Sequence, residues 1–234
     1  MASRSTNRAL FVLCVAALAA LPSAVSSQDV LSVLPAPATV RLTQSLEAAA
    51  RHARSLWRDV PPVNEDGTVN AYVEISRGDR RKWEFDIRAN RRAIDRVMPA
   101  GIGGYPVNYG FVPQTISYDG DPFDALVLGP PLPGGRLVQG VIVGLMFMED
   151  EKGLDSKVVL SVPGADGAPL HALTAQDQRT IAEYFRRYKE HEPKAFSKVP
   201  GWGSVADGLA QVQTAHAFFG KCRERAGQPC QLTR

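Results

Sequence analysis

Three carboxylates fall within one short run of the sequence, DGDPFD at residues 119–124. Carboxylates this close together repel one another in a folded protein unless cations neutralise them. Oxygen ligands of this kind select hard ions such as Mg²⁺ or Mn²⁺. The Gly permits a tight turn and the Pro fixes its own φ, so we expect Asp119, Asp121 and Asp124 on a rigid turn that leads into a strand. The run therefore predicts a metal-binding platform.

The spacing excludes a calcium-binding EF-hand loop. Such a loop would need an acid or amide, a Gly and a Glu at positions where this sequence has Phe123, Asp124 and Pro130. An isolated Asp-Gly-Asp is more often a solvated turn than a metal site, so the interpretation depends on the rest of the chain. No group of Cys and His has the spacing of a zinc site, and zinc is disfavoured on that ground.

A second acidic segment, EDEKGLDSK at residues 149–157, is predicted to be a turn between two strands. Asp155 and Lys157 share a face, because side chains alternate along a strand. In the earlier segment KWEFDI the same alternation turns Lys82 and Glu84 outward. One such polar face is typical of an ordinary solvated strand. Here, however, carboxylates that can hold cations occur beside basic groups that can hold anionic oxygens. This combination predicts a site for a metal-bound phosphate compound.

The rest of the chain has the pattern of a mainly β protein with flanking helices. The dense Gly and Pro over 101–113 predict a tightly turned backbone there. The predicted strands are 71–75, 82–87, 94–98, one starting at Asp124, 137–148, and one starting near Lys157. The predicted helices are 45–57, one that starts with a capping box at Thr174 and continues to Tyr188, and one from about 205 to 223.

The N-terminus is typical of a secretory signal peptide. Arg4 and Arg8 precede the apolar run Ala9–Leu21, and small residues follow. The run is too short to span a bilayer comfortably, so we expect an exported, periplasmic or extracellular protein whose mature chain has no stable membrane insertion. An organelle transit peptide is the alternative. The predicted organisation is a signal peptide over 1–26, a linker with a short helical extension over 27–69, and one globular domain over 70–234.

Charge and cysteine content bear on the partners and on the disulfide bonds of the protein. Without the two N-terminal arginines the chain has 25 basic and 24 acidic residues, so no general nucleic-acid surface is indicated. Cys14 lies in the apolar N-terminal run, which leaves Cys222 and Cys230 in the mature chain. In an exported protein these two could close a short disulfide loop, whereas in a reducing compartment they would be free thiols.

The run DGDPFD resembles the signature of the family I soluble inorganic pyrophosphatases, supported by YPVNYG at 105–110 and DEKGLDSK at 150–157. The resemblance extends from about residue 71 to 202. It implies an α+β fold, mainly β, with a five-stranded OB-like barrel and C-terminal helices. It also implies hydrolysis of inorganic pyrophosphate to two orthophosphates by a metal-activated water. The implied cofactor is Mg²⁺, several ions per site, with Mn²⁺ or Zn²⁺ as substitutes.

Carried over by position, the resemblance assigns a role to each charged candidate. The metal-binding aspartates are Asp119, Asp121, Asp124, Asp150 and Asp155. The phosphate-holding residues are Lys82, Arg96, Tyr105, Lys157, Tyr188 and Lys189, and further active-site positions are Glu74, Glu84, Tyr109 and Glu151. Asp121 resembles the residue that orients or deprotonates the attacking water, and the catalytic set adds Lys82, Arg96, Tyr105, Tyr188 and Lys189. No charged site residue is missing, which argues against a non-catalytic relative.

Two alternatives lack catalysis. OB-like barrels also bind oligonucleotides or sugars, but clustered carboxylates would repel a nucleic acid, so no nucleic-acid partner is expected. An exported calcium-binding protein would have no use for basic residues such as Lys82, Arg96 and Lys189 beside the acids. The predicted partners are therefore pyrophosphate and further copies of this chain in a homo-oligomer.

Overall fold

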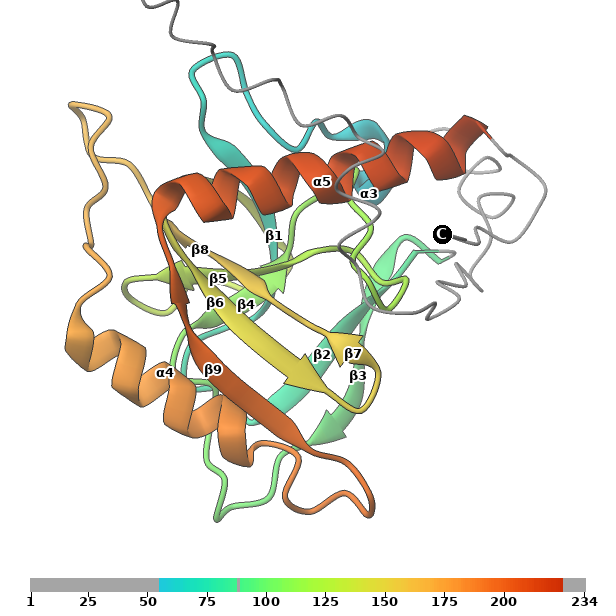
Figure 1. Ribbon diagram of the computed structural model, residues 1–234, viewed down its shortest axis with the longest axis vertical. Coiled ribbons are helices and arrows are strands. Elements are labelled where there is room, and N and C mark those ends of the chain that lie inside the picture. The colour runs from blue at the N-terminus through green and yellow to red at the C-terminus, as the bar shows by residue number, and fades with distance from the viewer. Residues whose placement is uncertain (1–54, 88, 225–234) are drawn as a thin grey trace, which may run out of the picture. The chain divides into compact units, whose positions relative to one another are not determined.

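The computed structural model describes residues 55–87 and 89–224 (Figure 1). These residues form a mainly β fold with helices on its outside. The strands are β1 (Val69–Ile75), β2 (Arg81–Asp86), β3 (Arg91–Val97), β4 (Asn108–Phe111), β5 (Asp124–Leu128), β6 (Arg136–Asp150), β7 (Gly153–Leu154), β8 (Lys157–Ser161) and β9 (Ser197–Gly203). The helices are α3 (Leu56–Asp59), α4 (Ala175–Arg187) and α5 (Val205–Glu224).

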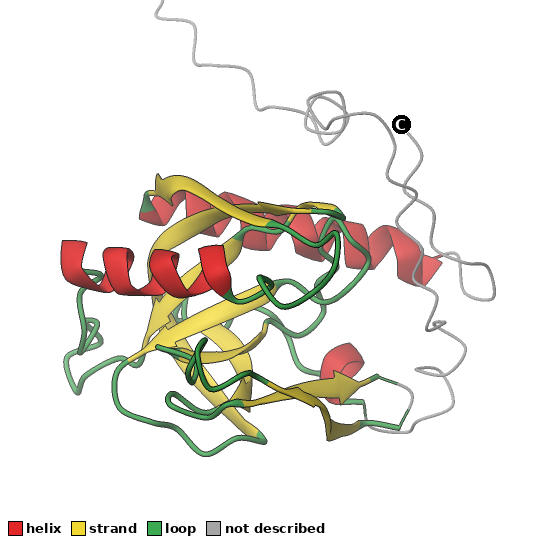
Figure 2. Cartoon of the chain, turned by 90° about the horizontal axis from the view of Figure 1, so that it is seen from below, coloured by secondary structure: helices red, strands yellow, loops and turns green. Residues whose placement is uncertain are grey.

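Five strands close into a barrel in the order β1-β4-β5-β8-β6, because β6 pairs back onto β1. All of these pairs are antiparallel except β5 with β8, which is parallel. The strands β7 and β9 pair with β6 outside this ring, and β2 and β3 form a separate hairpin. The expected five-stranded barrel with flanking helices is therefore confirmed (Figure 2).

The long strand β6 makes closure feasible, because its successive parts pair with β1, β8 and β9. Gly144 lies at a register shift between β6 and β8. A second glycine permits the β1–β4 contact, since a Cβ on Gly110 would lie 1.8 Å from the carbonyl oxygen of Tyr72. Only glycine can occupy that position without separating the two strands.

Two helices cover the barrel at different places. The helix α4 begins at Thr174 with the predicted capping box, and its buried residues Ile181 and Phe185 pack into one apolar cluster. The helix α5 covers a second cluster through Val212 and Ala215. In Figure 1, α5 crosses above the barrel and α4 lies below it. Among the described residues no helix is long and apolar enough to cross a membrane.

Several details differ from the sequence expectation. The segment 101–113 was expected to be turned throughout, but Asn108–Phe111 form β4. The strand β9 was not predicted at all, and β3 begins at Arg91, ahead of the expected Ile94. All residues of β1 are buried, including the face that carries Tyr72 and Glu74. The reason is that the β2–β3 hairpin covers that face, with Phe85 against Tyr72 at 5.0 Å between ring centroids.

The expected helix over 45–57 falls mostly outside the described residues, and in the described part a single turn begins at Leu56 with Ser55 as its N-cap. Residues 55–69 pack onto the barrel, and the placement of the domain boundary at 70 stays a prediction. Cys222 is buried and disulfide-bonded, while its partner lies outside the described residues. The pairing of Cys222 with Cys230 therefore also stays a prediction, as does the signal peptide.

Candidate active site

The predicted acidic turn is a tight loop, called here the acid loop (residues 117–124), that leads into β5 at Asp124. Gly120 has a φ of +95°, a conformation that favours glycine. The Ser117 N–H donates to the carbonyl oxygen of Asp121 at 2.6 Å, which closes the loop. Its far end is fixed where the Phe123 N–H donates to the Thr115 hydroxyl at 2.9 Å. Local hydrogen bonds thus hold the three aspartates in place.

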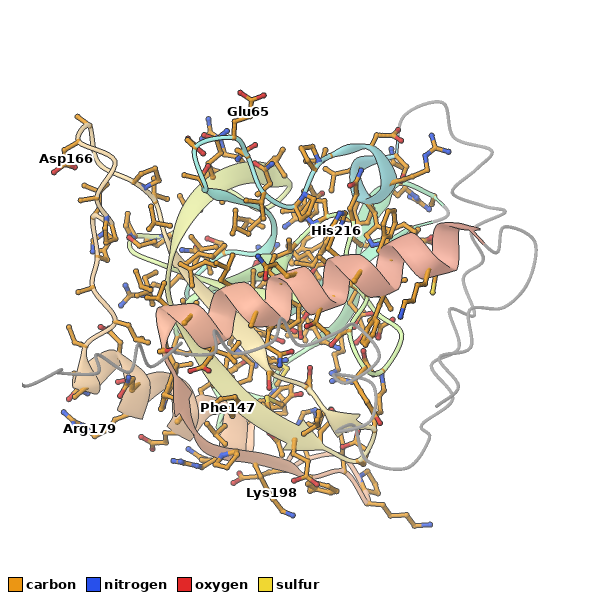
Figure 3. All side chains as sticks on the ribbon, turned by 45° about the horizontal axis from the view of Figure 1, so that its top comes forward. Glu65, Phe147, Asp166, Arg179, Lys198 and His216 are labelled. Carbon is orange, nitrogen blue, oxygen red and sulfur yellow. The ribbon has the colours of Figure 1, made fainter. Side chains whose placement is uncertain are left out.

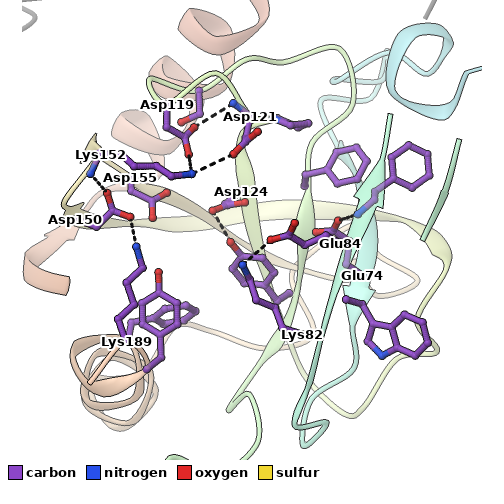
Figure 4. Close-up of a pocket in the computed structure, with 18 of the residues that line it drawn as sticks. Glu74, Lys82, Glu84, Asp119, Asp121, Asp124, Asp150, Lys152, Asp155 and Lys189 are labelled. Atoms are coloured by element: carbon purple, nitrogen blue, oxygen red, sulfur yellow. Dashed lines mark hydrogen bonds and ion pairs between the residues drawn. The ribbon is translucent and has the colours of Figure 1, made fainter. Parts of the chain in front are cut away.

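A polar cavity of about 260 Å³ opens beside this loop (Figure 4). Its lining includes fourteen of the fifteen site residues expected from the sequence, all except Lys157. Nine carboxylates and four basic groups face it, so negative charge is in excess. The carboxylates are Glu74, Glu84, Asp119, Asp121, Asp124, Asp150, Glu151, Asp155 and Glu192, and the basic groups are Lys82, Arg96, Lys152 and Lys189. Such a surface attracts cations.

Lys157 lies behind the cavity wall and is only 1% exposed. Its ammonium group donates to Asp124 Oδ2 at 2.6 Å and to Asp155 Oδ1 at 2.8 Å. Burial disfavours the charged form, but the two carboxylates outweigh it and raise the pKa of Lys157. The shared face of Asp155 and Lys157 expected from the strand alternation is therefore present. The ammonium group orients two aspartates, and a direct phosphate contact by Lys157 stays a prediction.

Lys189 follows the end of α4 and is the second buried lysine at the cavity. Its ammonium group donates to Asp150 Oδ2 at 2.6 Å and to Glu151 Oε1 at 2.7 Å. Burial works against the charge, yet these bonds raise the pKa of Lys189. Lys189 is therefore a cation at neutral pH, placed between the second acidic segment and the cavity.

Lys152 lies between two aspartates of the acid loop, 3.6 Å from Asp119 Oδ2 and 3.7 Å from Asp121 Oδ2 (Figure 4). The Asp121 side chain lines the cavity and is 70% exposed. The loss of hydration there and the charge of Asp119 raise the pKa of Asp121 from 3.8 to about 7. The loop therefore has a carboxyl group that titrates near neutral pH in the metal-free protein.

A buried network joins Asp124 to the neighbouring strands. The Tyr109 hydroxyl donates to Asp124 Oδ2 at 2.5 Å, and burial followed by the charge of Asp124 raises the pKa of Tyr109. Glu74 on β1 accepts a hydrogen bond from the Phe85 N–H at 2.6 Å. Burial and the charge of Asp124 raise the pKa of Glu74 well above its usual range. Tyr109 of β4 and Lys157 of β8 thus both bond to Asp124 of β5, while the hairpin bonds to Glu74 of β1.

The β2–β3 hairpin supplies the basic groups of the opposite wall. Lys82 donates to Glu84 Oε1 at 2.5 Å, and Arg96 forms an ion pair with Glu192 at 2.7 Å. Two tyrosines from elsewhere in the chain complete the wall, Tyr105 before β4 and Tyr188 at the end of α4. Burial raises the pKa of both phenols, so each is a neutral hydrogen-bond donor at neutral pH. This wall can donate to anionic oxygens.

The donor set fits a hard divalent cation, because every acidic ligand offers carboxylate oxygen and no Cys or His lines the cavity. In the part of the chain that the structure describes, no three such side chains converge tightly enough to hold an ion as they stand. The reason lies in the lysines, since Lys152, Lys157 and Lys189 already neutralise the aspartates. Lys152 is 57% exposed and can move away at small cost.

Two charged lining residues were not singled out from the sequence, Lys152 and Glu192. Lys152 was part of the recognised segment EDEKGLDSK, so its position between two acidic runs was the available signal. Glu192 lies in the connection between α4 and β9, and its ion pair with Arg96 joins residues far apart in the sequence. Nothing in the local pattern around Glu192 indicates that contact.

The fold and the cavity together define the class of protein. The barrel presents a cavity in which carboxylates that can hold cations lie beside Lys, Arg and Tyr side chains that can bind anionic oxygens. That combination is typical of an enzyme that acts on a metal-bound phosphate compound.

Known proteins agree with this class. The family described as inorganic pyrophosphatase matches residues 71–219. An inorganic pyrophosphatase of Saccharolobus solfataricus is 36% identical over 155 residues, which cover 63% of this chain and 89% of that protein. One from Thermus thermophilus is 38% identical over 159 residues, which cover 64% of this chain and 90% of that protein.

Solved structures of inorganic pyrophosphatases also match this fold. An inorganic pyrophosphatase from Coxiella burnetii superposes with a TM-score of 0.63 at 34% identity, covering 68% of this chain and 99% of that one. The structure from Thermus thermophilus superposes with a TM-score of 0.64 at 33% identity, covering 70% and 98%. The chain belongs to the inorganic pyrophosphatase family and is a hydrolase that acts on pyrophosphate. The alternatives without catalysis are not favoured.

Proposed function

We propose that the protein hydrolyses inorganic pyrophosphate to two orthophosphates with Mg²⁺ as its cofactor, and that Mn²⁺ or Zn²⁺ can substitute. The observation that supports this most strongly is the one cavity in which carboxylates lie beside basic and phenolic groups. Bound divalent cations neutralise the polyanion and lower the pKa of water, which makes a nucleophile available at neutral pH. Asp119, Asp121, Asp124, Asp150 and Asp155 are the residues that would hold them.

In this proposal Asp121 accepts the proton of the attacking water. Its carboxylate is exposed at the cavity, so it can accept a proton there. On the opposite wall, Lys82 and Arg96 hold one phosphoryl group through charge-assisted hydrogen bonds. Tyr188 and Lys189 hold the other and stabilise the charge that develops on the leaving phosphate. The remaining basic and phenolic groups, Tyr105 among them, fix the substrate in line for displacement.

The buried lysines keep the acidic site folded before metal binds. Lys157 and Lys189 each pair with two carboxylates that would otherwise repel one another. An active site with this charge excess is therefore assembled in advance, and only small side-chain movements are needed for ligand binding.

We also propose that the mature protein is exported and forms a homo-oligomer. The N-terminal apolar run after Arg4 and Arg8 supports export. Size-exclusion chromatography with light scattering would measure the oligomeric state, and a monomer at micromolar concentration would argue against the second part.

The function is tested by phosphate release from pyrophosphate with wild type, Asp121→Asn and a matched control, each with Mg²⁺ and with EDTA. The control is Asp166→Asn, the same chemical change on an exposed loop away from the cavity (Figure 3). We expect Mg²⁺-dependent release by the wild type and the control, and a loss of about 10² to 10⁴-fold in Asp121→Asn. Equal activity of all three proteins would refute the assigned role.

A further inference from the structure

The single-turn helix α3 lies before the residues matched by the family, 71–219, yet it is firmly attached to the fold. Trp57 is fully buried, and its ring packs edge-to-face on Phe219 of α5 with 4.8 Å between centroids. A buried Trp contributes several kcal/mol through its apolar area. The turn is therefore a fixed part of the structure, and its contacts lead toward the active site.

The first set of contacts joins α3 to the acid loop. The indole N–H of Trp57 donates to the carbonyl oxygen of Thr115 at 3.0 Å. The Thr115 hydroxyl in turn accepts the Phe123 N–H at 2.9 Å, next to the metal-binding Asp124. Thr115 lies just before the acid loop, and Phe123 lies at the end of the loop. Two hydrogen bonds, both to Thr115, therefore connect Trp57 to the backbone of the acid loop.

Gln114 strengthens this link. Its φ of +49° is unusual for a residue other than glycine, so surrounding contacts must hold it. Its N–H donates to the carbonyl oxygen of Trp57 at 2.7 Å, and its side-chain amide donates to the carbonyl oxygen of Arg58 at 2.7 Å. From the other side, His216 Nδ1 lies 2.8 Å from the Gln114 carbonyl oxygen (Figure 3). Thus α3 and α5 together hold the segment that precedes the acid loop.

A second contact joins α3 to the other wall of the active site. The Leu56 N–H donates to Asn90 Oδ1 at 3.0 Å, and Asn90 lies in the turn between β2 and β3 with a φ of +49°. These strands carry Lys82 and Arg96. The hairpin shares no ladder with the barrel, so its position depends on side-chain contacts of this kind.

We propose that α3 is a positioning element for the reaction: it holds the acid loop in register with the β2–β3 hairpin, and so fixes the metal-binding carboxylates relative to the groups that bind phosphate. Trp57 of α3 and Asn90 of the β2–β3 turn are the two positioning residues. The inference rests on the proposed function for the identity of the ligands. It accounts for the burial of Trp57, for the left-handed backbone at Gln114 and for the polar tie to the hairpin turn. Neither residue touches the substrate.

The test uses two variants of the full chain, each of which removes one of these hydrogen bonds. Trp57→Phe keeps an aromatic ring against α5 but loses the N–H that reaches Thr115. Asn90→Gly removes the side-chain amide whose oxygen accepts from Leu56, and Gly adopts the positive φ without strain. One hydrogen bond to a fixed segment corresponds to a factor of about ten at most. We expect Trp57→Phe to raise the Mg²⁺ concentration for half-maximal activity about threefold to tenfold, and Asn90→Gly to raise KM for pyrophosphate by a similar factor.

A core variant serves as the control for stability. Val212→Ala removes apolar contacts under α5, away from the cavity, and should lower the melting temperature without changing either constant. If Trp57→Phe and Asn90→Gly lose stability in the same way and keep both constants within about twofold of wild type, α3 is merely structural and the proposal is wrong. Calorimetric Mg²⁺ titration gives a readout without turnover. A wild type that binds Mg²⁺ but releases no phosphate would refute the proposed function, while weaker Mg²⁺ binding by Trp57→Phe would still support the positioning role.

Discussion

Replacing Asp121 by Asn should separate catalysis from folding. In the metal-free protein the ionised Asp121 carboxylate is disfavoured by lost hydration and by the charge of Asp119, which raise its pKa from 3.8 to about 7. A pKa shift of this size would correspond to about 4 kcal/mol of unfolding free energy if it acted in full. Because 70% of the side chain is exposed, solvent screening reduces the expected effect to about 1 kcal/mol.

The sign of the pH dependence follows from the raised pKa. Between pH 4 and pH 7 the folded protein holds a proton on Asp121 that the unfolded chain releases, so stability falls as pH rises through this range. This loss of stability is absent below the ordinary pKa of 3.8 and complete above about pH 7. The metal-free Asp121→Asn variant should therefore match the wild type at low pH and be more stable by about 1 kcal/mol at pH 8.

Urea unfolding with EDTA at pH 4 and pH 8 measures this difference, and the same titration with Mg²⁺ should reverse it. Mg²⁺ binds the folded wild type and stabilises it by mass action, while the variant has lost a ligand and gains less. Circular dichroism of both proteins controls for the fold. A variant that is less stable than wild type at pH 8 without metal would show that Asp121 stabilises the loop, and the charge argument would then be wrong.

Other perturbations should act in distinct ways. Lys189→Met removes a phosphate contact, so KM for pyrophosphate should rise about tenfold in steady-state kinetics. It also leaves a buried carboxylate unpaired, so urea unfolding should show lower stability of the metal-free protein. An unchanged KM would argue against the phosphate contact. Lys157→Met should destabilise the metal-free protein by about 3 to 5 kcal/mol, because it leaves a buried carboxylate pair without its cation; a loss below 1 kcal/mol would refute this. N-terminal sequencing of the natural protein should find a start near Ser27 or Gln28, with the Cys222 thiol oxidised in a thiol assay; an intact Met at the start would contradict export.

The sequence predicted the acid loop and most of the barrel, because both depend on local patterns. Alternating apolar residues indicated β6 and β8, and the DGDPFD run indicated a rigid turn at the start of β5. The strand β4 was missed because it is short and includes Gly110, which is typical of a turn. The strand β9 was missed because it contains Pro200, which is tolerated since β9 pairs only with β6.

The parts of the site that were not predicted arise from contacts between distant segments. Glu192 meets Arg96, and Trp57 meets Thr115, only after the barrel has closed. The burial of Lys157 was likewise not evident, since a lysine at the start of a strand is usually exposed. Its position depends on two carboxylates that outweigh the loss of hydration, and their approach is set by the parallel pairing of β5 with β8.

The most direct test of the account is the rate of orthophosphate release from pyrophosphate by the purified protein. With Mg²⁺ the protein should release two orthophosphates for each pyrophosphate consumed. EDTA should abolish the release, and excess Mg²⁺ should restore it. Release at the same rate in EDTA, or none from the folded protein with Mg²⁺, would contradict a metal-dependent pyrophosphatase.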